Sequence, residues 1–257
     1  MPKLAKALLA TLSATLLLTA TPAPVQATTT AAATETERTF TPTEIDAWIA
    51  GASAILNYHN HEITNLFAHN LRPDVRRQAG NTARHILTGN MWNIQNRDDL
   101  IAQVESLTHW GHNSQFWYDF LIVFELVEEG GIELLETLVA HGGLELSAAL
   151  HMLEIVDIAM FWGEAGIVAW DMFRVGNLLV WGYHADFITR AEARELMVPA
   201  IHILREHFDS WEEAAANYLD GLLYWRRGMD DEVLTRIDVV ERMFEREDPV
   251  FNNSLFD

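Results

Sequence analysis

The sequence predicts a single all-α domain, and three observations support this prediction. From Thr41 onward, apolar residues recur at the three- and four-residue spacing of half-buried helices, and capping signals stand at the segment starts. We find no convincing two-residue alternation and no Asn-Gly hairpin turn, so strands are not expected. There is also no repeat of fixed period. The expected fold is one globular bundle of about nine or ten helices, for which a chain of this length is sufficient.

The first 27 residues predict an export signal. Lys3 and Lys6 give a positive start, an uncharged apolar run spans 7–20, and residues 25–27 suit a signal peptidase. This run is shorter than the roughly 20 residues that span a bilayer, although a retained anchor is the alternative. No second apolar stretch of that length is expected, so membrane insertion after signal removal is not expected. Residues 28–40, rich in Thr, Ala and Glu, predict a disordered linker. The expected location is periplasmic or secreted.

The helical domain is expected to span 41–248, followed by a C-terminal tail at 249–257. Its helices are expected at 41–56, 73–88, 96–110, 114–129, 132–141, 144–162, 164–181, from Thr189, from Ser210, and at 231–246. Thr189 with Glu192, and Ser210 with Glu213, are typical of capping boxes. The pair Gly130-Gly131 is expected to separate two of these helices.

The segment 164–181 differs from the others because it is apolar nearly all round. A helix without a polar face is normally buried on every side. We therefore expect this helix at the centre of the bundle, with the other helices packed around it.

Residues 166–174, which read Gly-Ile-Val-Ala-Trp-Asp-Met-Phe-Arg, resemble the central motif of the YbeU/YbeR-like bacterial domain of unknown function. Further matching blocks stand in order on both sides: Trp92-Asn93-Ile94, 96–100, Gly111-His112, Phe116, Trp181-Gly182-Tyr183, Ile188-Thr189, Glu192-Ala193, Phe208, Ser210-Trp211, Asn217-Tyr218-Leu219, Gly221 and Trp225. The resemblance spans 92–225, about half of the chain. It implies a fold and a set of positions, but no activity, because none is established for that family.

The charge balance excludes several classes of partner. Once the signal is removed, 15 arginines and no lysine stand against 37 acidic residues, a net charge of −22. Such a surface repels nucleic acids and anionic lipids, so neither is an expected partner. The acid excess indicates either a salty habitat or a genome that favours arginine codons. The chain has no cysteine, so disulfides and thiol chemistry are excluded.

Asp171 and Arg174 are the most informative candidate residues. Their spacing of three places them on one helix face, among apolar side chains that include Trp170. A lone buried charge costs several kcal/mol, so the two should pair or meet other polar groups. An internal ion pair that fixes the helix register is the favoured interpretation. Arg174 aimed at an anionic ligand, and Asp171 as a general acid–base, are the alternatives.

His109 and His112 lie three residues apart near a helix end. Two imidazoles there could bind zinc if a third ligand arrived, but the sequence identifies none. Stacking and helix capping are the structural alternatives. The group at 59–62, with His59 and His61, is a weaker candidate because residues two apart point to different helix faces. No metal and no other cofactor are therefore predicted.

His151, Glu154 and Asp157 recur at three-residue steps within the segment 144–162. Inward-facing carboxylates and histidines build metal sites in helix bundles. A solvated polar face on a surface helix gives the same spacing and is the favoured interpretation.

Asn217 and Tyr218 follow the helix start at Ser210. The structural interpretation makes Tyr218 a core aromatic with a hydrogen-bonded hydroxyl, and in the functional one the Asn217 amide contacts a ligand. Gly221, one turn later, would let a neighbouring helix approach closely. The nine tryptophans are read as core residues by default.

Two functional hypotheses follow. The first is a non-enzymatic binding module outside the cytoplasm, with an unknown protein or small molecule as ligand, because no complete catalytic constellation is found. Its candidate binding residues are His112, Trp170, Asp171, Arg174, Asn217 and Tyr218. The alternative is a hydrolase-like or metal-assisted enzyme that uses His112, Asp171 and Arg174. Grouping of these residues around one cleft would favour a ligand site, and separate core contacts would favour an architectural role.

Overall fold

The structure is a computed structural model that describes residues 38–60, 72–89 and 91–256. Its contacts divide the chain into two units, 1–41 and 42–257, and everything below concerns the second. The expected export signal lies outside the described residues, as does the expected linker up to residue 37. The described residues contain helices and no strand, which confirms the all-α prediction.

The helices follow one another with short connections. In chain order they are α2 (Pro42–His59), α3 (Pro73–Thr88), α4 (Arg97–His109), α5 (Gly111–Ala140), α6 (Leu146–Trp162), α7 (Val168–His184), α8 (Arg190–His207), α9 (Trp211–Arg226) and α10 (Asp231–Glu245). Two short 3-10 helices, η1 (Gly163–Ala165) and η2 (Asn253–Leu255), complete the described elements.

Several helix starts carry the caps that the sequence predicts. Thr189 and Glu192 form a reciprocal capping box at the start of α8. At the start of α9 the Ser210 side chain accepts from the backbone N–H of Glu213, whereas the Glu213 carboxylate accepts from the N–H of Asp209, so only half of the predicted capping box forms. Asn96 accepts from two backbone N–H groups of α4. These caps fix where three of the helices around α7 begin.

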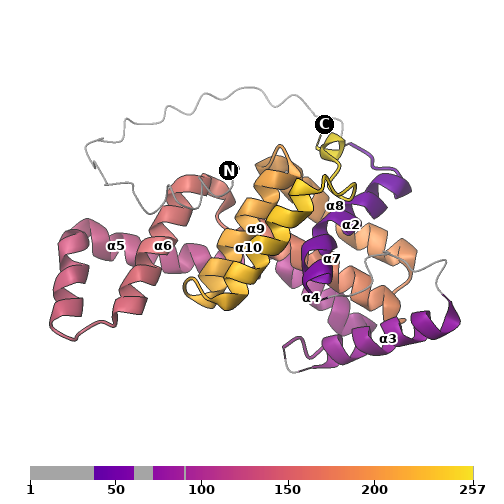
Figure 1. Ribbon diagram of the computed structural model, residues 1–257, viewed down its shortest axis with the longest axis horizontal. Helices are drawn as coiled ribbons and strands as arrows, with labels where there is room; N and C mark the ends of the chain where they lie inside the picture. Colours follow the sequence, from indigo (N-terminus) through magenta and orange to yellow (C-terminus); the bar gives the residue numbers. More distant parts are fainter. Residues whose placement is uncertain (1–37, 61–71, 90, 257) are drawn as a thin grey trace. The chain divides into compact units, whose positions relative to one another are not determined.

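Helix α7 is the centre of this unit, as its composition predicts. It contacts α2, α3, α4, α5, α8 and α9, and Figure 1 shows α2, α4, α8 and α9 gathered around it. From Val168 to Gly182 every residue is buried except Arg174. The apolar surface of α7 therefore supplies much of the core, and Arg174 is its exception.

The start of α7 differs from the expected one. The sequence predicts a start at Glu164, but Gly163–Ala165 forms a 3-10 turn and α7 starts at Val168. Gly166 separates the two with a φ of 53°. A Cβ there would lie 2.4 Å from the Asn113 side chain, so only glycine fits this close approach.

Helices α5 and α6 contact each other and extend away from the helices around α7 (Figure 1). The predicted boundary at Gly130-Gly131 appears as a kink, because Gly131 has non-helical angles (φ 68°, ψ −179°) inside α5. Helix α5 also contacts α4 and α7, and α6 contacts α9. We call this pair, residues 111–162, the α5–α6 arm.

The residues after α10 pack on the core. Phe256 contacts the rings of Trp48 and Trp211, with centroids 4.7 and 5.4 Å away. The Asn253 side chain accepts from the backbone N–H of Trp211 at 2.9 Å. This segment thereby covers two of the largest buried side chains of the unit.

Candidate functional site

The carboxylate of Asp171 lies at the N-terminus of α5. Asp171 comes from the first turn of α7 and is only 1% exposed. Its Oδ2 accepts from the backbone N–H of Asn113 at 2.8 Å. The first N–H groups of a helix have no partner within it, and the helix dipole favours a negative charge there. A buried carboxylate is therefore stabilised by a second helix.

Gly111 makes this contact sterically feasible. It opens α5 with a φ of 43°, and a Cβ on it would lie 2.1 Å from Asp171 Oδ2. Because any side chain would collide with the carboxylate, the Gly-His pair of the motif has a structural explanation. Glycine brings the backbone close, and the following histidine binds the same carboxylate.

His112 stands between Asp171 and Arg174. Its Nδ1 lies 2.6 Å from Asp171 Oδ1, and its Nε2 lies 3.2 Å from Arg174 Nη1. A carboxylate only accepts hydrogen bonds and a guanidinium only donates them. Nδ1 therefore carries the proton and Nε2 accepts from Arg174. The pair anticipated between Asp171 and Arg174 is thus a relay of three residues, in which each charge meets the imidazole.

Three tryptophans surround the guanidinium of Arg174. Its central carbon lies 3.9 Å from the ring centroid of Trp170, 5.3 Å from Trp225 and 5.5 Å from Trp92. These rings come from α7, from α9 and from the segment before α4. Such distances are within the range of cation–π attraction. We call Arg174, His112 and these three rings the Arg174 cage.

The guanidinium in the Arg174 cage is charged and makes few hydrogen bonds. Burial lowers the pKa of Arg174 to about 10, so it remains protonated at neutral pH. Among the described residues its one polar contact is with His112, although a guanidinium offers five N–H donors. Trp225, at the rim, is 48% exposed. The cage therefore holds a cation without a carboxylate in direct contact, close to the surface.

Asn217 lies apart from this cage and supports the start of α7. Its Oδ1 accepts from the backbone N–H of Ala169 at 2.9 Å, and its Nδ2 donates to Gly166 O at 2.8 Å. Asn113 plays a similar part, since its Oδ1 accepts from the Ile167 N–H at 2.8 Å. Both the oxygen and the nitrogen of the Asn217 side-chain amide are therefore bound to backbone groups, and neither contacts the guanidinium.

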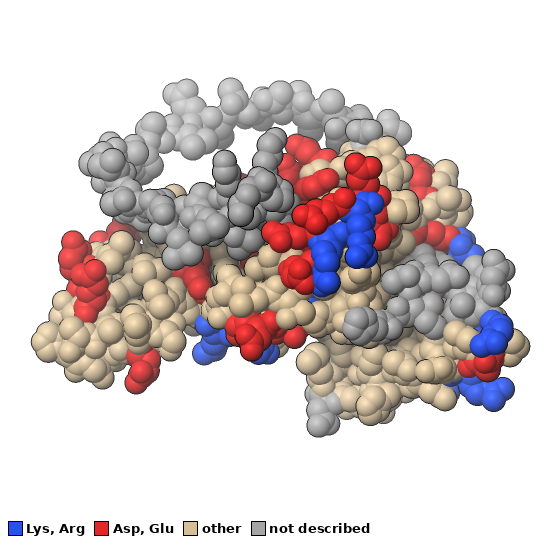
Figure 2. Space-filling model, in the orientation of Figure 1, with Lys and Arg blue, Asp and Glu red and all other residues tan. Residues whose placement is uncertain are grey.

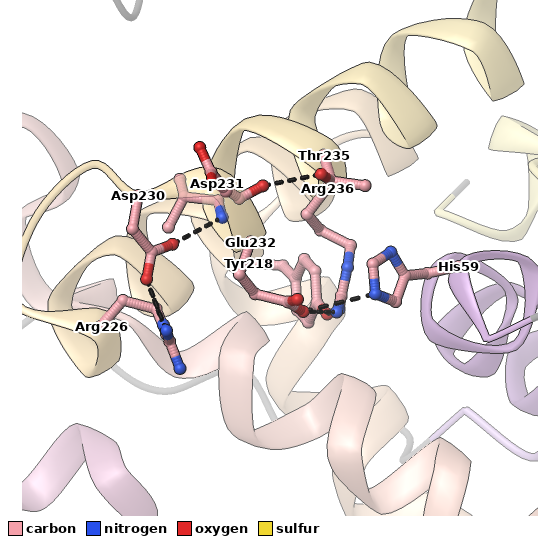
Figure 3. Close-up of polar contacts among 9 residues, drawn as sticks. His59, Tyr218, Arg226, Asp230, Asp231, Glu232, Thr235 and Arg236 are labelled. Atoms are coloured by element: carbon pink, nitrogen blue, oxygen red, sulfur yellow. Dashed lines mark hydrogen bonds and ion pairs between the residues drawn. The ribbon is translucent and has the colours of Figure 1, made fainter.

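Tyr218 belongs to a second buried polar chain. Its ring lies between Trp170 and Phe173, and its hydroxyl accepts from Arg236. Figure 3 shows Arg236 reaching Tyr218 from α10, beside Glu232 and His59. Burial raises the pKa of the Tyr218 hydroxyl. The hydroxyl is thus hydrogen-bonded inside the core, behind the Trp170 wall of the cage.

The remaining histidine candidates do not join the cage. His109 Nδ1 lies 2.9 Å from the carbonyl of Glu105 in its own helix. His59 lies 3.4 Å from Glu232, whereas His61 and Glu62 fall outside the described residues. Within the part of the chain that the structure describes, no three His, Asp or Glu residues are grouped as metal ligands.

Sequence reasoning missed Trp92, Trp225 and Asn113 as neighbours of the candidate residues. The two tryptophans stand in the motifs quoted for the resemblance, and that is the signal by which they could be found. Their distance from residue 174 in the chain hides the contact. Only the packing of α9 and of the 91–96 segment against α7 brings them to the guanidinium.

These features define an all-helical domain with a buried central helix and an Asp–His–Arg relay walled by tryptophan. A family model, described as "Protein of unknown function (DUF1266)", matches residues 89–253, so the chain belongs to this family. The match contains every residue of the Arg174 cage. It also confirms the resemblance to the YbeU/YbeR-like domain.

Two relatives are similar to this chain. The "Uncharacterized protein YbeU" of Escherichia coli (strain K12) is 30% identical over 135 residues, which are 52% of this chain and 55% of that protein. The "Uncharacterized protein YbeR" of the same organism is 24% identical over 157 residues, 55% of this chain and 58% of that protein. The chain thus spans about half the length of the curated relatives it matches. No solved structure matches the chain.

Proposed function

We propose that this protein is a non-enzymatic binding module that acts outside the cytoplasm, and that the Arg174 cage receives an anionic group of its ligand. The observation that carries the proposal is a charged guanidinium held by three aromatic rings with most of its donors unused. Arginine is suited to carboxylates and phosphates because its planar fork matches their oxygens.

The relay supports a fixed guanidinium. Asp171 is held by the α5 backbone, His112 by Asp171, and Arg174 by His112. A guanidinium that is already oriented loses little conformational entropy when an anion binds. The exposed ring of Trp225 adds an apolar wall, which suits an anion attached to a flat or apolar body.

The same geometry disfavours the hydrolase-like alternative. A general base needs its accepting nitrogen within reach of the proton that it abstracts. His112 Nε2 lies 3.2 Å from Arg174 Nη1, which uses that nitrogen as its acceptor. The accepting nitrogen of the Asp171–His112 pair is therefore occupied by Arg174 and does not point to a substrate proton.

The export signal read from Lys3, Lys6 and the apolar run at 7–20 supports a location in the periplasm or beyond. We propose a small molecule or an acidic group of a protein as the ligand. The net negative charge of the chain weakens long-range attraction of anions, so recognition would depend on the local cage.

The test titrates the purified protein with benzoate and, separately, with phenyl phosphate, following the indole N–H signals by NMR. Arg174→Gln should abolish the shifts that one or both probes cause, and the Arg97→Gln control, which alters an exposed ion pair, should not. A response to only one probe distinguishes a carboxylate from a phosphate ligand. Equal responses in wild type and Arg174→Gln would contradict the proposal.

A further inference from the structure

The α5–α6 arm exposes apolar side chains along both of its helices. In α5 these are Tyr118, Leu121, Ile122, Phe124 and Ile132, and in α6 they are Leu146, Leu150, Met160 and Phe161. Large apolar side chains gathered on one substructure usually mark a binding surface, whereas single ones need no explanation. The other exposed large apolar residues of the described part are spread from residue 91 to residue 234: Met91, Trp110, Trp225, Met229 and Leu234.

Helix α6 departs from the sequence interpretation. His151, Glu154 and Asp157 are only partly exposed, whereas its most exposed positions include Leu150 and Met160. The favoured solvated polar stripe is therefore wrong. A second long apolar stretch is not expected from the sequence, yet Leu146–Ala165 is long and apolar enough to cross a membrane by length and composition alone. Only 28% of that window is buried, which is unlike a core helix.

The arm is also without positive charge. No lysine or arginine occurs between residues 98 and 173. Five exposed glutamates of α5 lie among or beside its apolar positions: Glu125, Glu128, Glu129, Glu133 and Glu136. In Figure 2 the part that corresponds to this arm is mostly uncharged, with acidic groups at its margins. The surface thus combines apolar contact area with charge of one sign.

This combination of apolar area and negative charge discriminates between three possible partners: a second copy of the chain, an anionic bilayer and a basic amphipathic helix. A second copy would bring the same acidic groups face to face, and like charges across an interface cost several kcal/mol. An anionic bilayer would be repelled for the same reason. A basic amphipathic helix satisfies both properties, because its apolar face covers the exposed side chains and its cationic face meets the glutamates.

We propose that the α5–α6 arm binds a basic, amphipathic helical segment of another protein. Helices α5 and α6 are in contact, and exposed apolar residues recur along both of them, which offers contact area of the length that such a segment needs. Met160, the most exposed apolar residue of α6, has the flexible side chain that adapts to helical partners. The exposed apolar residues of this surface, from Tyr118 to Phe161, include no residue of the Arg174 cage, so the two proposals rest on different observations.

The test measures binding of a synthetic Leu/Lys amphipathic helix to the full protein by titration calorimetry. The double variant Leu150→Ser with Met160→Ser should weaken binding at least tenfold. Leu234→Ser is the matched control, because Leu234 on α10 is 53% exposed, the same fraction as Leu150. Circular dichroism should show unchanged helix content in every variant, since all three positions are on the surface.

Charge and patterning are tested separately. Glu128→Gln with Glu129→Gln should also weaken binding, whereas the exposed Glu245→Gln on α10 should not. A Leu/Lys peptide of the same composition in scrambled order should bind far more weakly. Equal binding of the scrambled peptide, or an equal loss in the Leu234→Ser control, would overturn the proposal. The proposal would also be overturned if the wild-type protein floated with neutral lipid vesicles, or sedimented as a dimer, and the Leu150→Ser/Met160→Ser variant did not.

Discussion

At the residue scale, one carboxylate organises the candidate site. Asp171 binds the α5 backbone through Asn113 and the side chain of His112, so one buried charge is satisfied by a helix end and an imidazole. Removing one partner from such an arrangement destabilises the protein by more than the intact arrangement stabilises it. The reason is that the buried charge is left without its partners. The residues that approach Asp171 are therefore constrained in size as well as in chemistry.

Gly111→Ala should destabilise the protein by more than its backbone strain alone. A Cβ at this position would lie 2.1 Å from Asp171 Oδ2, and the φ of 43° already disfavours a side chain. Gly142→Ala is the control, because Gly142 has a φ of 70° but nothing within 4 Å of its Cβ position. We expect about 1 kcal/mol for the control and about 3 kcal/mol for Gly111→Ala in urea unfolding. Equal losses would show that the Asp171 contact does not matter.

Asp220 makes stability depend on pH. Burial raises its pKa from 3.8 to about 6, although Trp162 Nε1 donates to it at 2.6 Å. Between these values the native state keeps a proton that the unfolded chain has lost, so stability falls as pH rises through this window. The loss amounts to roughly 3 kcal/mol at most for this group.

Asp220→Asn should remove that loss, because an amide oxygen can still accept from Trp162 and carries no charge. The variant should therefore be more stable than wild type at about pH 7.5 and nearly equal to it at about pH 4. Urea unfolding at both pH values checks this, with the exposed Asp238→Asn as control. A constant difference between wild type and Asp220→Asn across the range would refute the assignment.

At the scale of single elements, the position of α7 depends on groups from other helices. Asn113 from α5 and Asn217 from α9 bind the backbone at residues 166–169, where the chain turns into the helix. Gly221 lets α9 lie against α7, since a Cβ there would be 2.3 Å from the Trp170 Cβ. Trp225, one turn further along α9, thereby reaches Arg174.

Asn217→Ala should cost about 2–4 kcal/mol, because it leaves a buried N–H of Ala169 and a buried carbonyl of Gly166 without their partner. Asn96→Ala removes an exposed helix cap and should cost about 1 kcal/mol. Denaturant unfolding of both variants provides the comparison. If the two losses were alike, the amide of Asn217 would be no more than an ordinary cap.

At the scale of the whole molecule, the acid excess governs the response to salt. The chain carries a net charge of −20, and self-repulsion of this size destabilises a compact state. The melting temperature should therefore rise as sodium chloride screens the repulsion. Equal stability in dilute buffer and in molar salt would favour codon usage over a salty habitat as the origin of this composition.

A charge-reduced variant provides the control for this prediction. Replacement of Glu128, Glu129 and Glu133 by glutamine removes three exposed negative charges from the α5–α6 arm. The salt dependence of its melting temperature should be shallower than that of wild type, because less repulsion remains to be screened. An unchanged slope would mean that ion-specific binding, and not screening, causes the effect.

The sequence by itself determined the class of fold, the central helix and several helix ends. Apolar residues all round α7 required burial, and local caps such as Thr189 with Glu192 depend on neighbours three residues apart. These properties are local in the chain, and sequence patterns report them directly. The motif around Asp171 and Arg174 could also be recognised from the sequence, although the hydrogen bonds that these two residues make could not.

Only the tertiary structure decided how these residues are used. His112 lies 59 residues from Asp171 in the chain, and Trp92 and Trp225 reach Arg174 from opposite directions along the sequence. The exposed apolar side of α6 was equally hidden, because its periodicity does not say which face its neighbours cover. Contacts between distant segments depend on how helices pack, and a pattern within one helix carries no information about the orientation of another.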